Sequence, residues 1–112
     1  MSARSLDRTL LALAEPTRRG VIELLRRQPQ RASELAEQLG MSRPAMSRHL
    51  KLLRKTGLVS EDELEEDARV RMYRLERAPF TELRDWLADV EGFWGDQLGA
   101  FKAHAEKRQK RR

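Results

Sequence analysis

The most constraining feature of this sequence is a turn signal near its middle, where Gly40 and the run Ser42-Arg43-Pro44 separate two short apolar repeats. Glycine readily takes the left-handed backbone angles that end a helix, and serine caps the start of one by accepting from a backbone N–H of the next turn. Proline is tolerated in the first helical turn, where its missing N–H would have no partner. We therefore expect one helix to end at Gly40 and another to follow Ser42 and end at Gly57.

The helices on either side of this turn have the faces of a helix-turn-helix. Ala36 in the first is small enough for two helices to cross closely. The second has an apolar stripe of helical spacing, formed by Met46, Leu50 and Leu53. Its opposite face is small or cationic, with Pro44, Ser47, Arg48, Lys51 and Lys55. Short residues and arginine suit a helix in the major groove of DNA, whereas the alternative is a solvated face on an ordinary helical hairpin. The turn residues and the cationic face favour DNA recognition.

Further elements are expected on both sides of this motif. Leu6, Leu10 and Leu13 predict a first helix, with Ser5 as its cap, which ends before Pro16 because the residue before proline avoids helical angles. Pro16 then opens a second helix that Pro29 closes. Strand-forming residues predict a hairpin over residues 58–63 and 69–75. An apolar repeat from Phe80 to Phe101 predicts a last helix over residues 79–107, too long to be covered by the core of so small a chain.

Charge is distributed unevenly along the 112 residues, which carry a net charge of +5. Residues 1–57 hold 12 Lys and Arg against 5 Asp and Glu, whereas residues 58–79 hold 4 against 7. A basic N-terminal half indicates an anionic partner, with nucleic acid first. No apolar run is long enough for a membrane helix and no signal peptide precedes the first helix, so we expect a cytoplasmic protein that contacts no membrane.

Catalysis is not indicated by any residue pattern in the chain. There is no cysteine, which excludes disulfides and thiolate chemistry, and there are only two histidines. Ser47 and His49 are two residues apart and point to different sides of a helix, so they cannot form a catalytic pair. We therefore do not expect an enzyme.

Several separated segments resemble one known family in order and spacing. They are Leu13-Ala14-Glu15-Pro16-Thr17-Arg18-Arg19, Ser33-Glu34-Leu35-Ala36, the run from Met41 to Leu53, Gly57-Leu58-Val59 and Tyr73-Arg74-Leu75. Together they resemble the ArsR/SmtB family of bacterial winged helix-turn-helix regulators, and the similarity covers residues 6–104. The resemblance implies a mainly α fold with a small β-hairpin, and a homodimer that binds palindromic double-stranded DNA, most often as a repressor.

The resemblance also implies positions that bind DNA. On the recognition helix and its cap these are Ser42, Arg43, Pro44, Ser47, Arg48 and His49, to which the outward-facing Lys51 is added. Arg69 and Arg71 would lie on the wing, which is the β-hairpin. We expect a single domain over residues 1–106, in which 31–75 bind DNA and 5–14 and 79–106 form the dimer. Residues 107–112 are expected to be a basic disordered tail.

Metal binding is where the chain departs from many relatives. Residues 33–38 lack the cysteines of the thiophilic-metal sensors, and the pair Phe93-Trp94 resembles a metal-independent branch. His104 and Asp96 are the candidate ligands that remain, but no ligand residue lies one turn away from His104. We expect no cofactor. The alternatives are a nickel- or zinc-responsive regulator of the same family and a helical protein-interaction module such as an antitoxin.

The predicted wing is unusually acidic. Between residues 61 and 67 it carries Glu61, Asp62, Glu63, Glu65, Glu66 and Asp67. Carboxylates repel phosphates over about 8 Å at physiological salt. We expect the tip to stay off the DNA and Arg69 and Arg71 to make the wing contacts. The alternatives are that the acids pair with Arg or Lys, or bind a cation, when DNA is absent.

Overall fold

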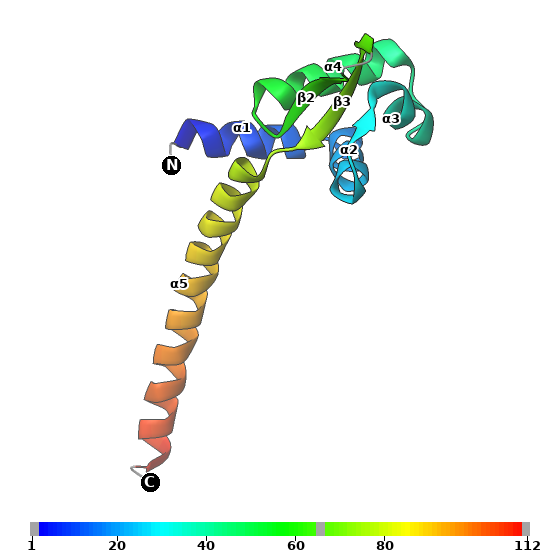
Figure 1. Ribbon diagram of the computed structural model, residues 1–112. Coiled ribbons are helices and arrows are strands. Elements are labelled where there is room, and N and C mark those ends of the chain that lie inside the picture. The colour runs from blue at the N-terminus through cyan, green and yellow to red at the C-terminus, as the bar shows by residue number, and fades with distance from the viewer. Residues whose placement is uncertain (1–2, 65–66, 111–112) are drawn as a thin grey trace. The chain divides into compact units, whose positions relative to one another are not determined.

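The computed structural model describes residues 3–64 and 67–110, with the backbone alone at residues 3, 64, 67–69, 98, 100, 109 and 110. Its elements follow the order α1, α2, β1, α3, α4, β2, β3 and α5 (Figure 1). The chain divides into two units, Met1–Glu82 and Leu83–Arg112. The first unit contains the sheet and the packed core, and it follows the winged helix-turn-helix order predicted from the sequence.

The helix-turn-helix consists of α3 (Ala32–Gln38) and α4 (Arg43–Lys55). Gly40 and Gly57 have positive φ angles of 62° and 81°, a conformation that costs glycine little and other residues more. Ser42 caps α4, since its Oγ accepts from the N–H of Ala45 at 3.3 Å. The predicted stops at both glycines and the predicted cap are therefore confirmed.

A three-stranded antiparallel sheet has the order β1-β3-β2. β2 (Val59–Leu64) and β3 (Asp67–Leu75) form the predicted hairpin, seen as paired arrows near α4 in Figure 1. The third strand, β1 (Gln30–Arg31), was not predicted from the sequence. It pairs with Met72 and Tyr73 of β3, and two residues are too few to show a strand pattern of their own.

The core of the first unit is made by apolar side chains from the helices, from β2 and from Leu58, which directly precedes β2. Its fully buried members are Ala12, Val21, Leu25, Leu35, Ala36, Met46, Leu50, Leu53, Leu58 and Val59. α2 (Pro16–Arg27) contributes Val21 and Leu25, and α4 contributes the three residues of its predicted stripe. This packing holds one side of α4 against the core and leaves the other side in solvent.

The first helix, α1 (Ala3–Leu13), differs from its prediction in two respects. It begins before Ser5, whose hydroxyl donates to Glu82 at 2.8 Å, so the prediction of a Ser5 cap is wrong. Thr9 and Ala12 are the residues it buries, whereas Leu10 is 40% exposed. Thr9 can be buried because its hydroxyl donates to the carbonyl of Ser5 at 3.1 Å.

The last helix, α5, extends from Arg77 to Lys110, longer at both ends than predicted. Residues 107–110, assigned from sequence to a disordered tail, continue this helix, since Lys, Arg and Gln are good helix formers. Within Leu83–Arg112 Leu83 is half-buried, and the other large apolar side chains that are described are exposed, namely Trp86, Leu87, Val90, Phe93, Trp94 and Phe101. In the described ranges, no helix has the length and apolar character needed to cross a membrane.

Candidate nucleic-acid interface

The outward face of α4 is cationic and open to solvent. α4 carries five Lys and Arg residues and no Asp or Glu. Its exposed side chains include Arg43, Pro44, Ser47, Arg48 and Lys51, all of them predicted DNA contacts, and exposed Ser42 precedes them. Among the described residues, Arg43, Arg48 and Lys51 form no ion pair with a carboxylate. These cations are therefore available to phosphates and base edges.

His49 is set apart from the other predicted contacts on α4. Its side chain is 21% exposed, and its Nδ1 lies 3.8 Å from Oε2 of Glu15 at the start of α2. Glu15 also caps α2, because the same oxygen accepts from the N–H of Arg18 at 2.9 Å. Burial disfavours the charged carboxylate, but hydrogen bonds from Arg18 and Thr17 and the nearby imidazole outweigh it, so the pKa of Glu15 is lowered. His49 thus connects α4 to α2.

A hollow of about 380 Å³ lies where α3, α4 and β3 meet. Three arginines line it, namely Arg31, Arg43 and Arg71, together with Ala32, Ser33, Ser47, Val70 and Tyr73. Arg31 reaches this place because β1 pairs with β3, and it was not among the residues singled out from the sequence. Its Nε also donates to Glu34 at 2.8 Å. No local sequence signal could have found this grouping, since it depends on strand pairing over about 40 residues.

The hairpin neutralises most of its described cations internally. Glu61, only 17% exposed, accepts from Arg54 at the end of α4 and from Arg71 of β3, the latter at 2.6 Å. Burial raises the pKa of Tyr73, and so do hydrogen bonding to Glu61 and the negative charge of that carboxylate. Arg71 also lies 3.6 Å from Glu63. Arg71 is therefore less available to DNA than Arg43, Arg48 and Lys51 of α4.

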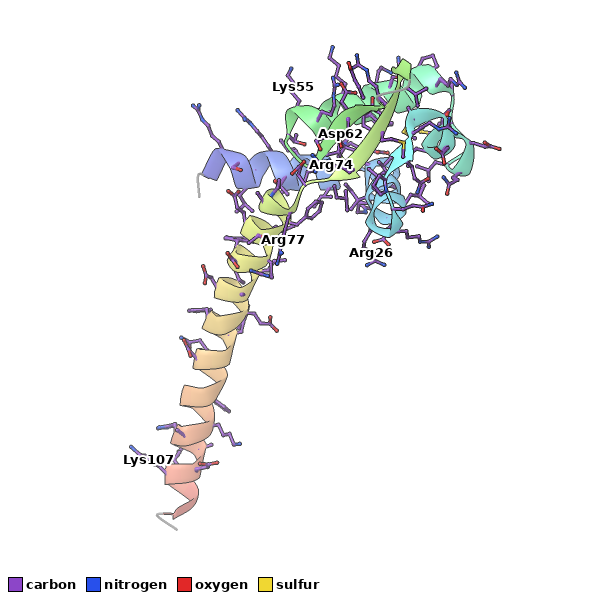
Figure 2. The ribbon with its side chains drawn as sticks, in the orientation of Figure 1. Arg26, Lys55, Asp62, Arg74, Arg77 and Lys107 are labelled. Carbon is purple, nitrogen blue, oxygen red and sulfur yellow. The ribbon has the colours of Figure 1, made fainter. Side chains whose placement is uncertain are left out.

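Arg74 is paired in the same manner on β3. Its guanidinium lies 2.8 Å from Asp62 and 3.2 Å from Glu76, and Figure 2 labels Arg74 and Asp62 close together on the hairpin. Asp62 raises the pKa of Arg74 by hydrogen bonding and by its charge, with Glu76 adding to it. The alternative that wing acids pair with arginines thus holds for Glu61, Asp62 and Glu63. Glu65 and Glu66, and the side chains of Asp67 and Arg69, lie outside the described residues.

Two arginines after the α1–α2 turn have a structural role that the sequence reading did not assign. Arg18 donates from Nε to the carbonyl of Ala12 at 2.7 Å and from Nη2 to that of Leu11 at 3.2 Å. Arg19 donates to the carbonyl of Leu13 at 2.7 Å. The last carbonyls of a helix lack partners within it, so these contacts cap the end of α1.

Metal ligands do not gather in the part of the chain that the structure describes, where no group of three or more His, Asp or Glu comes together. Asp96 and His104 are exposed on α5, eight residues and therefore about 12 Å apart along one helix. One ion cannot bridge that distance within a single chain, so these residues do not fit a metal site by themselves.

Comparisons of the sequence and of the fold with known proteins match the same kind of protein, a helix-turn-helix transcriptional regulator. The family model described as bacterial regulatory protein, arsR family, matches residues 15–61. The HTH-type transcriptional regulator Rv2034 of Mycobacterium tuberculosis is 40% identical over 98 residues, which span 88% of this chain and 86% of that protein. An ArsR-like transcriptional regulator from Rhodococcus sp. RHA1 has a TM-score of 0.77 at 30% identity, and the match covers 96% of this chain and 98% of that one.

Repression appears in the name of a more distant relative. The transcriptional repressor SdpR of Bacillus subtilis is 34% identical over 50 residues, 45% of this chain and 56% of that protein.

The winged helix-turn-helix fold and its exposed cationic helix define a class of DNA-binding regulator. The chain belongs to the ArsR family and is a helix-turn-helix transcriptional regulator, a class whose members are typically repressors.

Proposed function

We propose that this regulator binds a palindromic operator as a homodimer, with α4 of each subunit in the major groove, and represses transcription from it. The observation that carries the proposal is the outward face of α4, where Arg43, Arg48 and Lys51 are exposed on a helix without a carboxylate. Such a face attracts phosphates and reaches base edges. A regulator of this kind acts where the chromosome lies, which is the cytoplasm.

The homodimer is proposed because two helices carry apolar surface that the chain itself does not cover. Leu10 and Leu11 on α1 are exposed, and Trp94 on α5 is 61% exposed beside an equally open Phe93. Contiguous exposed aromatic and aliphatic side chains of this size mark interaction surfaces in soluble proteins. A two-fold partner would bury them and set two α4 helices about 34 Å apart, the spacing of successive major grooves.

The hollow between α3, α4 and β3 is proposed to hold a backbone phosphate of the operator. Arg31, Arg43 and Arg71 supply positive charge, and Ser33 and Ser47 supply hydroxyl donors. Guanidinium groups bind phosphate through paired N–H donors. In this role Arg31 and Arg43 fix the register of α4 on the duplex, while Arg48 discriminates bases.

The experiment that tests the proposal combines footprinting with binding at several salt concentrations. Genome-wide footprinting on the organism's own DNA identifies an operator, and fluorescence anisotropy then gives its affinity from about 50 to 200 mM salt. We expect log K to fall with log salt at a slope of about −0.9 for each phosphate contacted. Sedimentation at micromolar concentration should show a dimer. A salt-independent interaction, or a monomer, would contradict the proposal and favour a protein-interaction module.

A further inference from the structure

One carboxylate connects the end of α4 to both strands of the hairpin. Glu61 of β2 accepts from Arg54, in the last turn of α4, and from Arg71 of β3 at 2.6 Å. Both guanidinium groups donate from Nη1 to the same oxygen, Oε1 of Glu61. The side chain of Glu61 is 17% exposed, whereas those of Arg54 and Arg71 are 38% and 46% exposed. The carboxylate is therefore the least accessible member of the group, and its two partners are open to other anions.

Arg71 has a second place to bind an anion. It lines the hollow between α3, α4 and β3 together with Arg43 and Ser47, which is the proposed site of a backbone phosphate. A phosphate in that hollow competes with the Glu61 carboxylate for the same guanidinium. Arg71 also lies 3.6 Å from Glu63, whose side chain is 61% exposed, so water screens this longer contact. The contact with Glu61 is therefore the one that a phosphate has to replace.

Arg54 makes this replacement possible. A carboxylate held away from water is costly when it loses its last cation. If Arg71 leaves, Glu61 still accepts from Arg54, which is not part of the lining of the hollow. Arg74 has no comparable choice, because it is paired with Asp62 and Glu76 and does not line the hollow either. Of these two hairpin arginines, Arg71 is the one that can move between a carboxylate and the hollow.

We propose that Glu61 is a positioning residue, which holds Arg71 in the free protein and releases it to a backbone phosphate when the operator binds. Arg54 remains on Glu61 in both states. Binding then exchanges one ion pair for another, so Glu61 lowers operator affinity without preventing binding. This inference rests on the proposed DNA-binding function, to which it adds a residue that acts on DNA only through Arg71.

The first test is Glu61→Gln in the full chain, which keeps the size of the side chain and removes its charge. Arg71 is then free before DNA arrives, so operator affinity in anisotropy titrations should rise about threefold, as for loss of one partly exposed ion pair. The salt slope should remain that of wild type, because the number of phosphates contacted is unchanged. The matched control is Asp62→Asn, which removes the same charge from the neighbouring residue but leaves Arg74 on Glu76. This control should bind within about 1.5-fold of wild type.

The second test asks whether Glu61 acts through Arg71. In Arg71→Gln the salt slope should fall by about 0.9, which corresponds to one phosphate contact, and it should fall equally in the double variant E61Q/R71Q. The gain in affinity from E61Q should be absent when Arg71 is replaced. A purely structural role of Glu61 would change the midpoint of urea unfolding, but it would not make a gain in affinity depend on Arg71.

The role of Arg54 is tested in the same manner. Arg54→Gln removes the partner that stays, so release of Arg71 then leaves Glu61 without a cation, and operator affinity should fall about threefold. In the E61Q background the same substitution should have no effect, because no charge is left to neutralise. An equal loss in both backgrounds would mean that Arg54 contacts DNA itself, and its assigned role would be wrong.

Circular dichroism and urea unfolding establish that each variant is folded. The exchange is overturned if E61Q binds no more tightly than D62N. It is also overturned if E61Q binds more weakly, since Glu61 would then orient Arg71 toward the phosphate. If E61Q does not fold, R71Q alone decides, because an unchanged salt slope would show that Arg71 stays on Glu61 in the complex. Failure of wild type to bind the operator would instead count against the proposed function.

Discussion

The helix α4 and the β2–β3 hairpin both carry arginines, but they present them in opposite electrostatic states. α4 holds five cations without an acid, and most of them extend into solvent. On the hairpin, Arg71 and Arg74 are each held by carboxylates of the same hairpin or of the residue that follows it. The difference teaches that the charge of an element does not by itself identify a DNA-binding surface. A cationic surface is available to DNA only where its cations are not already paired with carboxylates of the protein.

Strand register explains why the hairpin neutralises itself. Glu63 lies directly opposite Arg71, and Glu61 lies two positions away on the same face, opposite Tyr73. Arg71 therefore meets one carboxylate directly across the ladder and a second one on the diagonal. Exposed pairs of this kind contribute only about 0.2–1 kcal/mol each. DNA phosphates could displace them, but each displacement has a cost that Arg43, Arg48 and Lys51 of α4 do not have. We therefore expect α4 to contribute more to the affinity for DNA than the hairpin does.

The largest expected effect is the loss of operator affinity in Arg48→Ala. Arg48 is exposed and, among the described residues, has no carboxylate partner, so its truncation should weaken specific binding by about 1–3 kcal/mol if it contacts a base. The matched variant is Arg74→Ala, which removes an arginine already paired with Asp62 and Glu76 and should change affinity by less than about 1 kcal/mol. Anisotropy titrations at one salt concentration measure both. Equal losses would break the comparison between α4 and the hairpin.

Reversing the charge of the hairpin tip should have the next largest effect. Replacing Glu65, Glu66 and Asp67 with lysine removes like-charge repulsion and adds phosphate partners, so operator binding should tighten by about tenfold, or 1.4 kcal/mol, at low salt. The salt dependence should steepen by about 0.9 for each phosphate gained. The glutamine variant at the same positions removes the acids without adding cations and should show a smaller gain and no steeper slope. If the lysine variant binds no more tightly, the tip does not approach the DNA.

Arg31→Ala should have a smaller effect that is uniform across DNA sequences. Arg31 lines the hollow with Arg43 and Arg71, yet it already donates to Glu34. Loss of one phosphate contact should therefore cost up to about 1 kcal/mol and reduce the salt slope by about 1. Arg27→Ala, at the exposed end of α2, is the control and should bind normally. A loss confined to one operator sequence would show that Arg31 contacts a base.

What could be predicted from the sequence was local, and what could not depended on contacts between distant residues. The cap at Ser42, the glycine turns and the buried stripe of α4 each follow from residues within one or two helical turns. β1 exists only because it pairs with β3. The buried face of α1 depends on the elements that α1 packs against. Thr9 is buried and Leu10 is exposed, although the leucine repeat predicts that Leu10 faces the core.

The same distinction between local and long-range contacts applies to the predicted DNA-binding residues. Helical spacing predicted the exposed Pro44, Ser47, Arg48 and Lys51, because the buried stripe of α4 determines which face is open to solvent, whereas Arg43 was implied by the family resemblance. Arg31 was missed and the pairing of Arg71 was left open, because both depend on the sheet. His49 lies next to the outward face in sequence, but its side chain lies 3.8 Å from Glu15, the cap of α2, which is distant in the sequence.

The smallest expected effect concerns Glu15, whose carboxylate lies beside His49 of α4 and, among the described residues, forms no ion pair with the Lys and Arg residues of that helix. Its hydrogen bonds to Arg18 and Thr17 lower its pKa below the ordinary value of 4.5 in the folded chain. A carboxylate with a lowered folded pKa stabilises the fold above its unfolded pKa, and this contribution disappears as the pH falls through the folded pKa. Glu15→Gln should therefore lower the free energy of unfolding at pH 7 and match wild type in strong acid. Urea unfolding across this pH range measures the difference, with Glu23→Gln on the exposed face of α2 as the control.

Because Glu15 does not neutralise the outward cations, operator affinity at pH 7 should remain that of wild type as long as the variant is folded. A gain in affinity like that expected for the hairpin variants would show instead that Glu15 restrains the DNA-binding face through His49.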